Sequence, residues 1–143
     1  MTEAFTSEAT IDRPVEVVWE RLVDWDSAAT WMPGVEALRA KGPTAPGTAL
    51  VFTTRGKERT GSIAAVDPGR SITLRSIQGG VTADYVYACV PQGNGTRVSL
   101  LADCRMSGPV RVLGPLIRLA IRRADSRQLD RFAATWGPGW GPG

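Results

Sequence analysis

Histidine is absent from the sequence, and cysteine occurs only at Cys89 and Cys104. Without histidine, the chain lacks the commonest metal ligand and the side chain that most often transfers protons near neutral pH. A zinc site, a Ser-His-Asp triad and a Cys-His pair are therefore not expected, and we predict no metal and no cofactor. Both cysteines fall inside predicted strands, so we expect them to be buried free thiols.

Long hydrophobic runs are also missing. No segment approaches the ~20 apolar residues of a membrane-spanning helix, and no signal-like segment precedes the first predicted strand. With 43% hydrophobic and 22% charged residues, the 143-residue chain has the composition of an ordinary globular domain. The default expectation is a cytoplasmic protein.

Positive charge is concentrated near the C-terminus. Residues 109–143 contain six arginines and two aspartates, whereas the whole chain has a net charge of +3. No nucleic-acid-binding motif or cluster of basic and aromatic residues accompanies these arginines, so we predict no nucleic-acid partner. The simplest interpretation is a solvated helix face whose arginine stems cover apolar neighbours. Docking of this face on an anionic membrane surface is a weaker alternative.

The segment from Pro109 to about Trp136 is the one stretch long enough to form a major helix. Its apolar residues recur mostly at spacings of three and four, as in a helix with one buried stripe. The stripe comprises Leu113, Leu116, Ile117, Ala120, Ile121, Ala124, Leu129 and Phe132. Residues 137–143 are rich in glycine and proline and cannot continue the helix. We therefore predict one domain over residues 1–136 and a flexible tail over 137–143.

The N-terminal part begins with alternating apolar and polar side chains, the pattern of a half-buried strand. Pro14 then indicates the start of a helix, and Pro33-Gly34 ends a second, shorter helical stretch. The expected order is a strand over 3–12, a helix over 15–23, a short helix over 24–32 and a strand over 35–41.

Four turn signals divide the segment after residue 48 into antiparallel strands. They are Arg55–Glu58, Asp67–Arg70, Gln78–Gly80 and Pro91–Gly95. Because side chains alternate along a strand, the turns fix which residues lie opposite each other. The predicted cross-strand pairs are Thr54–Arg59, Phe52–Gly61, Leu50–Ile63, Ala65–Ile72, Ile63–Leu74, Leu74–Tyr85, Ile72–Tyr87, Tyr87–Leu100, Tyr85–Ala102 and Cys89–Val98.

This register separates an apolar face from a polar one. The apolar face carries Leu50, Phe52, Ile63, Ile72, Leu74, Tyr85, Tyr87, Val98, Leu100, Cys104 and Met106. The polar face carries Thr53, Arg75, Asp84, Arg97, Ser99, Asp103 and Arg105. Such a separation is typical of an antiparallel sheet with one solvated face.

Three short stretches resemble a known family. Ile11 to Trp19 resembles the opening of the bacterial polyketide cyclase/dehydrase (SRPBCC) branch of the START-like, or Bet v 1-like, helix-grip superfamily. Asp24-Trp25, followed by Trp31 to Val35, resembles its second-helix segment, and Gly93 to Val98 resembles its last hairpin. The resemblance implies an α+β fold in which a curved antiparallel sheet of about seven strands surrounds a long C-terminal helix, with two short helices after the first strand. It also implies a cavity between sheet and helix, since members bind lipids, sterols, hormones, quinones or polyketide chains, and some cyclise aromatic polyketides.

Polar residues on the otherwise apolar sheet face are the candidate site residues. Burying an unpaired arginine is costly, so Arg59 should lie at the cavity mouth or pair with an anion. There it is either a solvated strand end or an anchor for a ligand carbonyl, enolate or carboxylate. Tyr85 is either a packing residue or, beside Arg59, a general acid. The predicted ligand-binding residues are Trp31, Phe52, Thr54, Leu74, Ser76, Tyr85, Tyr87, Leu100, Leu113, Ile117 and Ala120. Trp31 either packs its short helix against the rim of the sheet or forms part of the entrance.

Two functional classes follow from these observations. The favoured class is a protein that binds or carries a small hydrophobic molecule. The alternative is a polyketide cyclase or dehydratase in which Tyr85 and Arg59 are the catalytic residues. A membrane-docking carrier of a lipid or quinone is a third, weaker hypothesis. Fold alone cannot choose among them, because one fold supports several activities.

Overall fold

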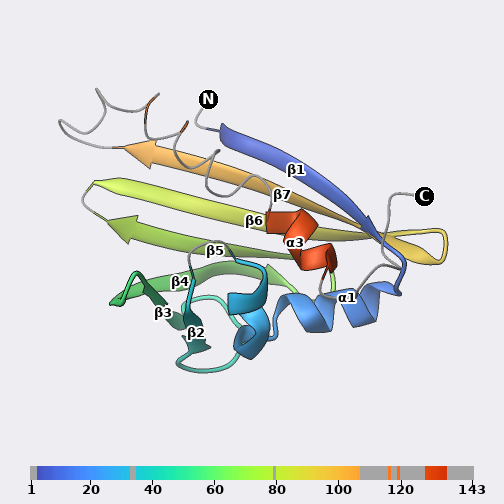
Figure 1. The fold of residues 1–143 in the computed structure, drawn as a ribbon, viewed down its shortest axis with the longest axis horizontal. Coiled ribbons are helices and arrows are strands. Elements are labelled where there is room, and N and C mark those ends of the chain that lie inside the picture. Colours follow the sequence, from blue (N-terminus) through green and yellow to red (C-terminus); the bar gives the residue numbers. More distant parts are fainter. Residues whose placement is uncertain are drawn as a thin grey trace.

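The computed structural model describes residues 3–32, 35–78, 80–106, 116, 119 and 128–134. In chain order the elements are β1 (Glu3–Ile11), α1 (Val15–Leu22), the 3₁₀ helix η1 (Trp25–Thr30), β2 (Ala37–Ala40), β3 (Ala49–Thr54), β4 (Lys57–Asp67), β5 (Ser71–Gln78), β6 (Val81–Gln92), β7 (Gly95–Met106) and α3 (Gln128–Ala134). One seven-stranded antiparallel sheet has the order β1-β7-β6-β5-β4-β3-β2. Figure 1 shows α1, η1 and α3 on one side of this curved sheet. The predicted α+β class and the curved antiparallel sheet are confirmed.

The two N-terminal helices differ in type. Helix α1 follows the predicted pattern, and its apolar residues Val18 and Leu22 are buried. The second helix is shorter and tighter than the one predicted over 24–32. In it the Ser27 hydroxyl donates a hydrogen bond to the main-chain carbonyl oxygen of Asp24 at 3.0 Å. The Thr30 hydroxyl likewise donates to the main-chain carbonyl oxygen of Ser27 at 2.6 Å. Such bonds to the residue three positions earlier accompany 3₁₀ turns, which explains the difference.

The predicted C-terminal helix is described only in part. Helix α3 lies against β1 and β7, and its Leu129 and Phe132 are fully buried, as the apolar stripe predicts. Leu116 is 66% exposed, although the same stripe included it. On an ideal helix with about 100° per residue, positions sixteen apart lie about 160° from each other, so the predicted stripe could not hold both Leu116 and Phe132 on one face. Except for Leu119, the remaining residues of the predicted helix lie outside the described part of the chain.

The register of the β3–β4 hairpin differs from the prediction by two residues. Phe52 lies opposite Arg59, and Thr54 lies opposite Lys57. The connection is a two-residue turn in which Arg55 and Gly56 have φ angles of 51° and 76°. Two consecutive positive φ angles define the type I′ turn, which joins strands more tightly than the four-residue loop predicted there. Because a shift of two preserves the alternation, every side chain keeps its predicted face.

The later hairpins follow the predicted register closely. Leu74–Tyr85, Ile72–Tyr87, Tyr85–Ala102, Tyr87–Leu100 and Cys89–Val98 are all confirmed as cross-strand pairs. In β4, Ile63 opposes Leu74 as predicted, but a bulge follows, and Val66 rather than Ala65 opposes Ile72. The extra residue of a bulge shifts the register of every pair beyond it.

The hydrophobic core lies between the helices and the inner face of the sheet, the face that carries Ile63, Ile72, Tyr87, Val98 and Leu100. These residues are buried together with the apolar residues of the helices. Cys89 and Cys104 are buried free cysteines, as predicted. The outer face carries the polar residues.

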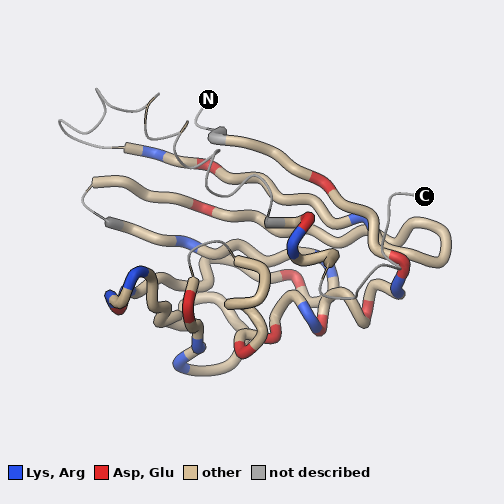
Figure 2. Tube along the Cα trace, in the orientation of Figure 1, with Lys and Arg blue, Asp and Glu red and all other residues tan. Residues whose placement is uncertain are grey.

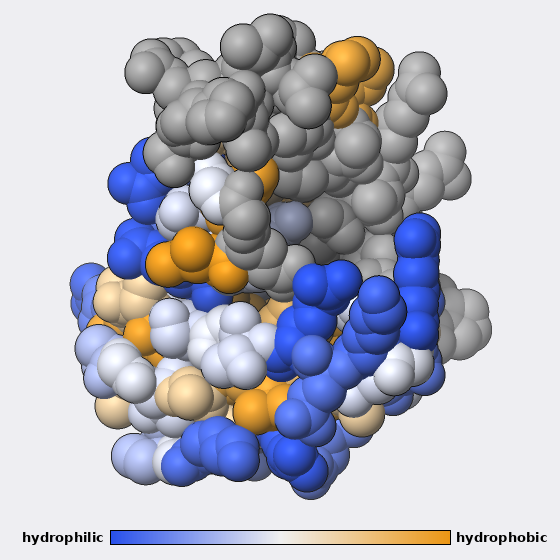
Figure 3. Space-filling view, turned by 90° about the vertical axis from the view of Figure 1, so that its left-hand side faces the viewer, coloured by the Kyte–Doolittle hydropathy of each residue, from blue (hydrophilic) through white to orange (hydrophobic). Residues whose placement is uncertain are grey.

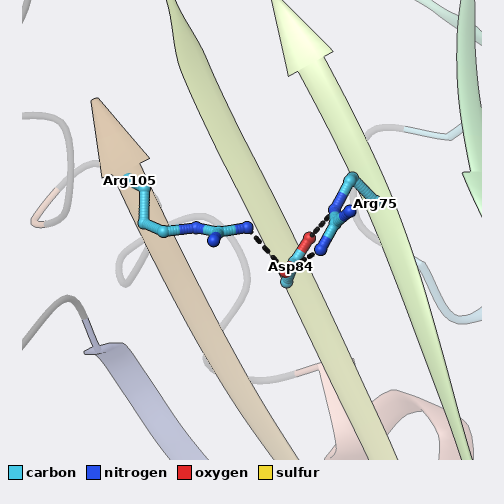
Figure 4. Close-up of polar contacts among 3 residues, drawn as sticks. All are labelled: Arg75, Asp84 and Arg105. Carbon is cyan, nitrogen blue, oxygen red and sulfur yellow. Dashed lines mark hydrogen bonds and ion pairs between the residues drawn. The ribbon is translucent and has the colours of Figure 1, made fainter. Parts of the chain in front are cut away.

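An ion network joins three strands on the outer face (Figure 4). Asp84 of β6 accepts hydrogen bonds from Nε and Nη2 of Arg75 at 2.7 and 2.9 Å, and from Nη2 of Arg105 at 3.1 Å. The Asp84 side chain is only 12% exposed. Hydrogen bonding to Arg75, aided by the positive charges of both arginines, lowers the pKa of Asp84 below its ordinary value of 3.8. The network therefore favours the ionised carboxylate.

Asp84→Asn is expected to lower the free energy of unfolding by about 1–2 kcal/mol at neutral pH, because it removes charge-assisted hydrogen bonds. Since folding lowers the pKa of Asp84, this stabilisation is present above the unfolded-state value of about 3.9 and is lost as the pH falls through the folded-state value. Denaturant unfolding of both proteins should show a gap that closes as the solution becomes more acidic than about pH 4.

Glu8→Gln is the matched control, since Glu8 is an exposed carboxylate on β1. It should change stability little at any pH. A gap between wild type and Asp84→Asn that persists undiminished in acid would show that packing, rather than charge, explains the effect.

Candidate ligand-binding site

The described residues line a partly open cavity on the inner side of the sheet, between strands β2 to β6 and the segment that follows η1. It has a volume of about 360 Å³. Its lining residues are Met32, Val35, Leu38, Leu50, Phe52, Thr54, Arg59, Gly61, Leu74, Arg75, Ser76, Ala83, Tyr85 and Tyr87. Figure 3 views the end of the molecule where the β3–β4 hairpin lies, and it shows hydrophobic surface exposed among hydrophilic side chains. This main cavity has the size and mixed polarity of a small-molecule site.

Sheet register places the polar residue Ser76 between two small residues that also line the cavity. Gly61 on β4 lies opposite Ser76 on β5, and Ser76 in turn lies opposite Ala83 on β6. Arg59, two residues before Gly61, is exposed although it lines the cavity. Its guanidinium is therefore at the mouth, one of the two positions expected for it. Tyr85 lies deeper and is half-buried.

Gly61 allows two strands to approach closely beside the cavity. A Cβ at this position would lie 2.7 Å from the Arg75 carbonyl oxygen and 3.6 Å from Cε1 of Phe52. The first distance is too short for any side chain, so glycine is required by the backbone of β5. The cross-strand neighbour of Gly61 on β3 is Leu50, whereas the predicted register placed Phe52 there.

Of the residues predicted to bind ligand, Phe52, Thr54, Leu74, Ser76, Tyr85 and Tyr87 line the cavity, as does Arg59. Trp31 and Leu100 are buried in the core and do not line it. Leu113, Ile117 and Ala120 lie outside the described residues. A role for any of these residues in binding or catalysis remains a prediction.

Trp31 supports the cavity from behind instead of forming its entrance. Its side chain is fully buried, and its ring meets Tyr87 edge-on at a centroid distance of 5.8 Å and Phe132 at 4.8 Å. Tyr87 lines the cavity, so Trp31 joins the cavity wall to α3. The Nε1–H groups of Trp31 and Trp25 are buried without a hydrogen-bond partner in the described part of the structure.

Sequence reasoning missed much of the apolar lining. The cavity residues that were not predicted are Met32, Val35, Leu38, Leu50 and Ala83, although Leu50 was placed on the correct face of the sheet. Leu38 pairs with Phe52 in the sheet, and the register of that edge strand would have revealed it. Met32 and Val35 depend on how η1 meets β2, which the local sequence pattern does not specify.

A second hollow, of about 490 Å³, lies between the β4–β5 turn and the start of α1. Its lining includes Arg70 and Cys89 among apolar residues. Burial raises the pKa of the Cys89 thiol to about 11, so this cysteine is protonated and a poor nucleophile near neutral pH. We therefore assign the candidate site to the main cavity, which collects the larger set of polar groups.

No group of three or more Cys, Asp or Glu side chains able to hold a metal occurs among the described residues, and the chain has no histidine. In the same part of the chain, no helix has the length and hydropathy needed to cross a membrane.

The sequence model of a family described as polyketide cyclase / dehydrase and lipid transport matches residues 2–137. The chain belongs to this family. No curated protein matches it significantly. This assignment confirms the resemblance inferred from Ile11 to Trp19.

Solved structures show the same fold. TTHA0849 from Thermus thermophilus is 19% identical, with 90% of this chain and 92% of that chain covered and a TM-score of 0.68. The Zhui aromatase/cyclase from Streptomyces sp. R1128 is 16% identical, with 92% and 91% covered and a TM-score of 0.69. Ara h 8.0201 is 15% identical, with 92% and 95% covered and a TM-score of 0.67. At these identities the likeness establishes the fold and leaves the activity to be argued from the site.

Proposed function

We propose that this protein binds a small hydrophobic molecule in the main cavity. The observation that carries the proposal is the cavity itself, about 360 Å³ of space walled mainly by apolar side chains in a chain of 143 residues. A space of this size, with a few convergent polar groups, is typical of a ligand site.

The proposal predicts saturable binding of a neutral apolar dye such as N-phenylnaphthylamine, with a rise in dye fluorescence as it leaves water. One dye per protein should bind, and an apolar competitor should displace it. Native mass spectrometry of protein purified from its own host should in addition reveal a co-purifying apolar molecule. Dye fluorescence that rises linearly without saturation would contradict the proposal.

A cyclase or dehydratase is the second candidate, because Tyr85 and Arg59 both line the cavity. In an aldol addition, an enolate carbon of the substrate would attack a ketone carbon, and the Tyr85 hydroxyl would protonate the ketone oxygen as its C=O π bond breaks. Arg59 would stabilise the negative charge of the enolate and of that oxygen. Two of the similar structures are described as aromatase/cyclases, one of them a two-domain protein from steffimycin biosynthesis. Those descriptions concern proteins of at most 16% identity, so they support the candidate only through the shared fold.

Tyr85→Phe separates the two candidates. In a cyclase it should lower turnover of a linear polyketide substrate by about 100-fold or more, because general acid catalysis contributes roughly that factor. Dye binding should remain, since the phenyl ring is kept. The absence of any turnover by the wild-type protein, together with saturable dye binding, would leave the binding protein as the remaining candidate.

A further inference from the structure

The mouth of the main cavity is basic, and none of the described residues that line the cavity carries a carboxylate. Two arginines are part of the lining. The side chain of Arg75 is directed to the outer face, where it pairs with Asp84, so it does not present its charge to the cavity. Arg59 does, from β4 at the mouth. The interior of the cavity near Leu38, Leu50 and Met32 is apolar.

A second cation joins Arg59 through the register of the β3–β4 hairpin. Lys57 lies directly opposite Thr54, and Thr54 lines the cavity. Residues directly opposite in an antiparallel pair share a face, as do residues two apart on one strand. Lys57 and Arg59 therefore stand side by side on the inner face. Figure 2 shows basic positions gathered at the tip of this hairpin.

Two carboxylates lie near these cations. Glu58 alternates to the outer face and pairs with Arg39 at 3.5 Å. Glu36 accepts a hydrogen bond from the main-chain N–H of Gly56 at 2.8 Å, which holds it at the turn. One negative side chain, Glu36, is thus outnumbered by two positive ones, Lys57 and Arg59. The inner side of the hairpin therefore carries an excess of positive charge.

We infer that the ligand is an anionic amphiphile whose negatively charged group binds at Lys57 and Arg59 while its apolar body lies in the main cavity. This inference rests on the function proposed above and adds the charge and the orientation of the ligand. A neutral hydrophobic molecule uses the apolar wall alone, whereas an amphiphile with one carboxylate or enolate group also forms charge-assisted hydrogen bonds at the mouth. Partial shielding by the cavity strengthens these bonds relative to a fully exposed ion pair.

The inference is tested with decanoate and decan-1-ol, which share an alkyl chain and differ in charge. Binding is measured by displacement of N-phenylnaphthylamine at low and at high salt. We expect wild type to bind decanoate about tenfold more tightly than decanol at low salt, with the difference shrinking in high salt. In Lys57→Gln/Arg59→Gln, decanoate affinity should fall about tenfold, and decanol affinity should stay unchanged.

The control pair Lys41→Gln/Arg97→Gln removes one exposed lysine and one exposed arginine that do not line the cavity. It should bind both probes as wild type does, and thermal unfolding should confirm that both double variants are folded. If decanol binds as tightly as decanoate, or if the Lys57→Gln/Arg59→Gln protein keeps wild-type affinity for decanoate, the anionic ligand is excluded while hydrophobic binding stands. If neither probe nor the dye binds, the proposed function fails as well.

Discussion

Replacing Trp31 by alanine is expected to lower the free energy of unfolding by about 3–5 kcal/mol, the range measured for removal of large buried aromatic side chains. Trp31 is fully buried and packs against Tyr87 of β6 and Phe132 of α3. Its removal therefore leaves a void where η1, the sheet and α3 meet. Equilibrium unfolding in urea, followed by circular dichroism, measures the loss.

Trp31→Phe is the informative companion. Phenylalanine keeps a ring between Tyr87 and Phe132 and removes the Nε1–H that is buried without a described partner. An unsatisfied buried donor costs about 1–3 kcal/mol, so its removal offsets much of the lost packing. We expect a net loss below about 1.5 kcal/mol.

Trp25→Ala provides a control at a second indole. Trp25 also has a buried, unpartnered Nε1 atom, but its side chain is only partly buried at the edge of the core. It should cost less than Trp31→Ala. A Trp31→Ala protein as stable as wild type would show that η1 does not pack on the sheet as described.

The central strands of the sheet could be predicted from sequence because their turns are short and their side chains alternate strictly. Tyr85 and Tyr87 fall on the inner face through both hairpins that flank β6. The β3–β4 turn was predicted with four residues instead of two, since Arg55 gives no sign in the sequence of its positive φ. The face assignment was correct in spite of this, because the error was an even number of residues.

The bulge after Ile63 and the position of Trp31 could not be predicted in the same way. A bulge inserts one residue without a composition signal, and here it moves Ala65 out of its expected place opposite Ile72. The burial of Trp31 depends on contacts with β6 and α3, which are distant in sequence. The entrance was one of two positions expected for Trp31, because the short helices were expected at the rim of the sheet, and the structure places its ring in the core.

The site was predictable to the extent that it follows from alternation. Phe52, Leu74 and Ser76 were found because they share a face with the tyrosines, and they line the cavity. Lys57 was missed because the alternation was counted from a turn of the wrong length. The predicted register left it in the turn, and the type I′ geometry places it on the inner face opposite Thr54. Loop length thus affects which charges surround the cavity more than it affects which apolar residues line it.

Ala83→Phe is expected to abolish dye binding, with affinity lowered about 100-fold or more, while the protein remains folded. Ala83 is a small inward-facing residue of β6 that lines the main cavity opposite Ser76. A phenyl ring there would occupy the space where the ligand is proposed to lie. Because the ring enters a cavity and not a packed core, its cost in stability should be at or below the lower end of the roughly 1–3 kcal/mol of overpacking. Dye titration and thermal unfolding measure the two effects separately.

Thr82→Phe is the matched control, since Thr82 precedes Ala83 on β6 and its side chain points to the outer face. It introduces the same ring on the same strand and should leave dye affinity unchanged. Ala83→Leu should give an intermediate loss, because a smaller side chain fills less of the roughly 360 Å³. Equal dye affinity in wild type and in a folded Ala83→Phe protein would place the dye outside the main cavity. In that case the second hollow, beside Arg70 and Cys89, would be the next site to test, because it is also large enough to hold the dye.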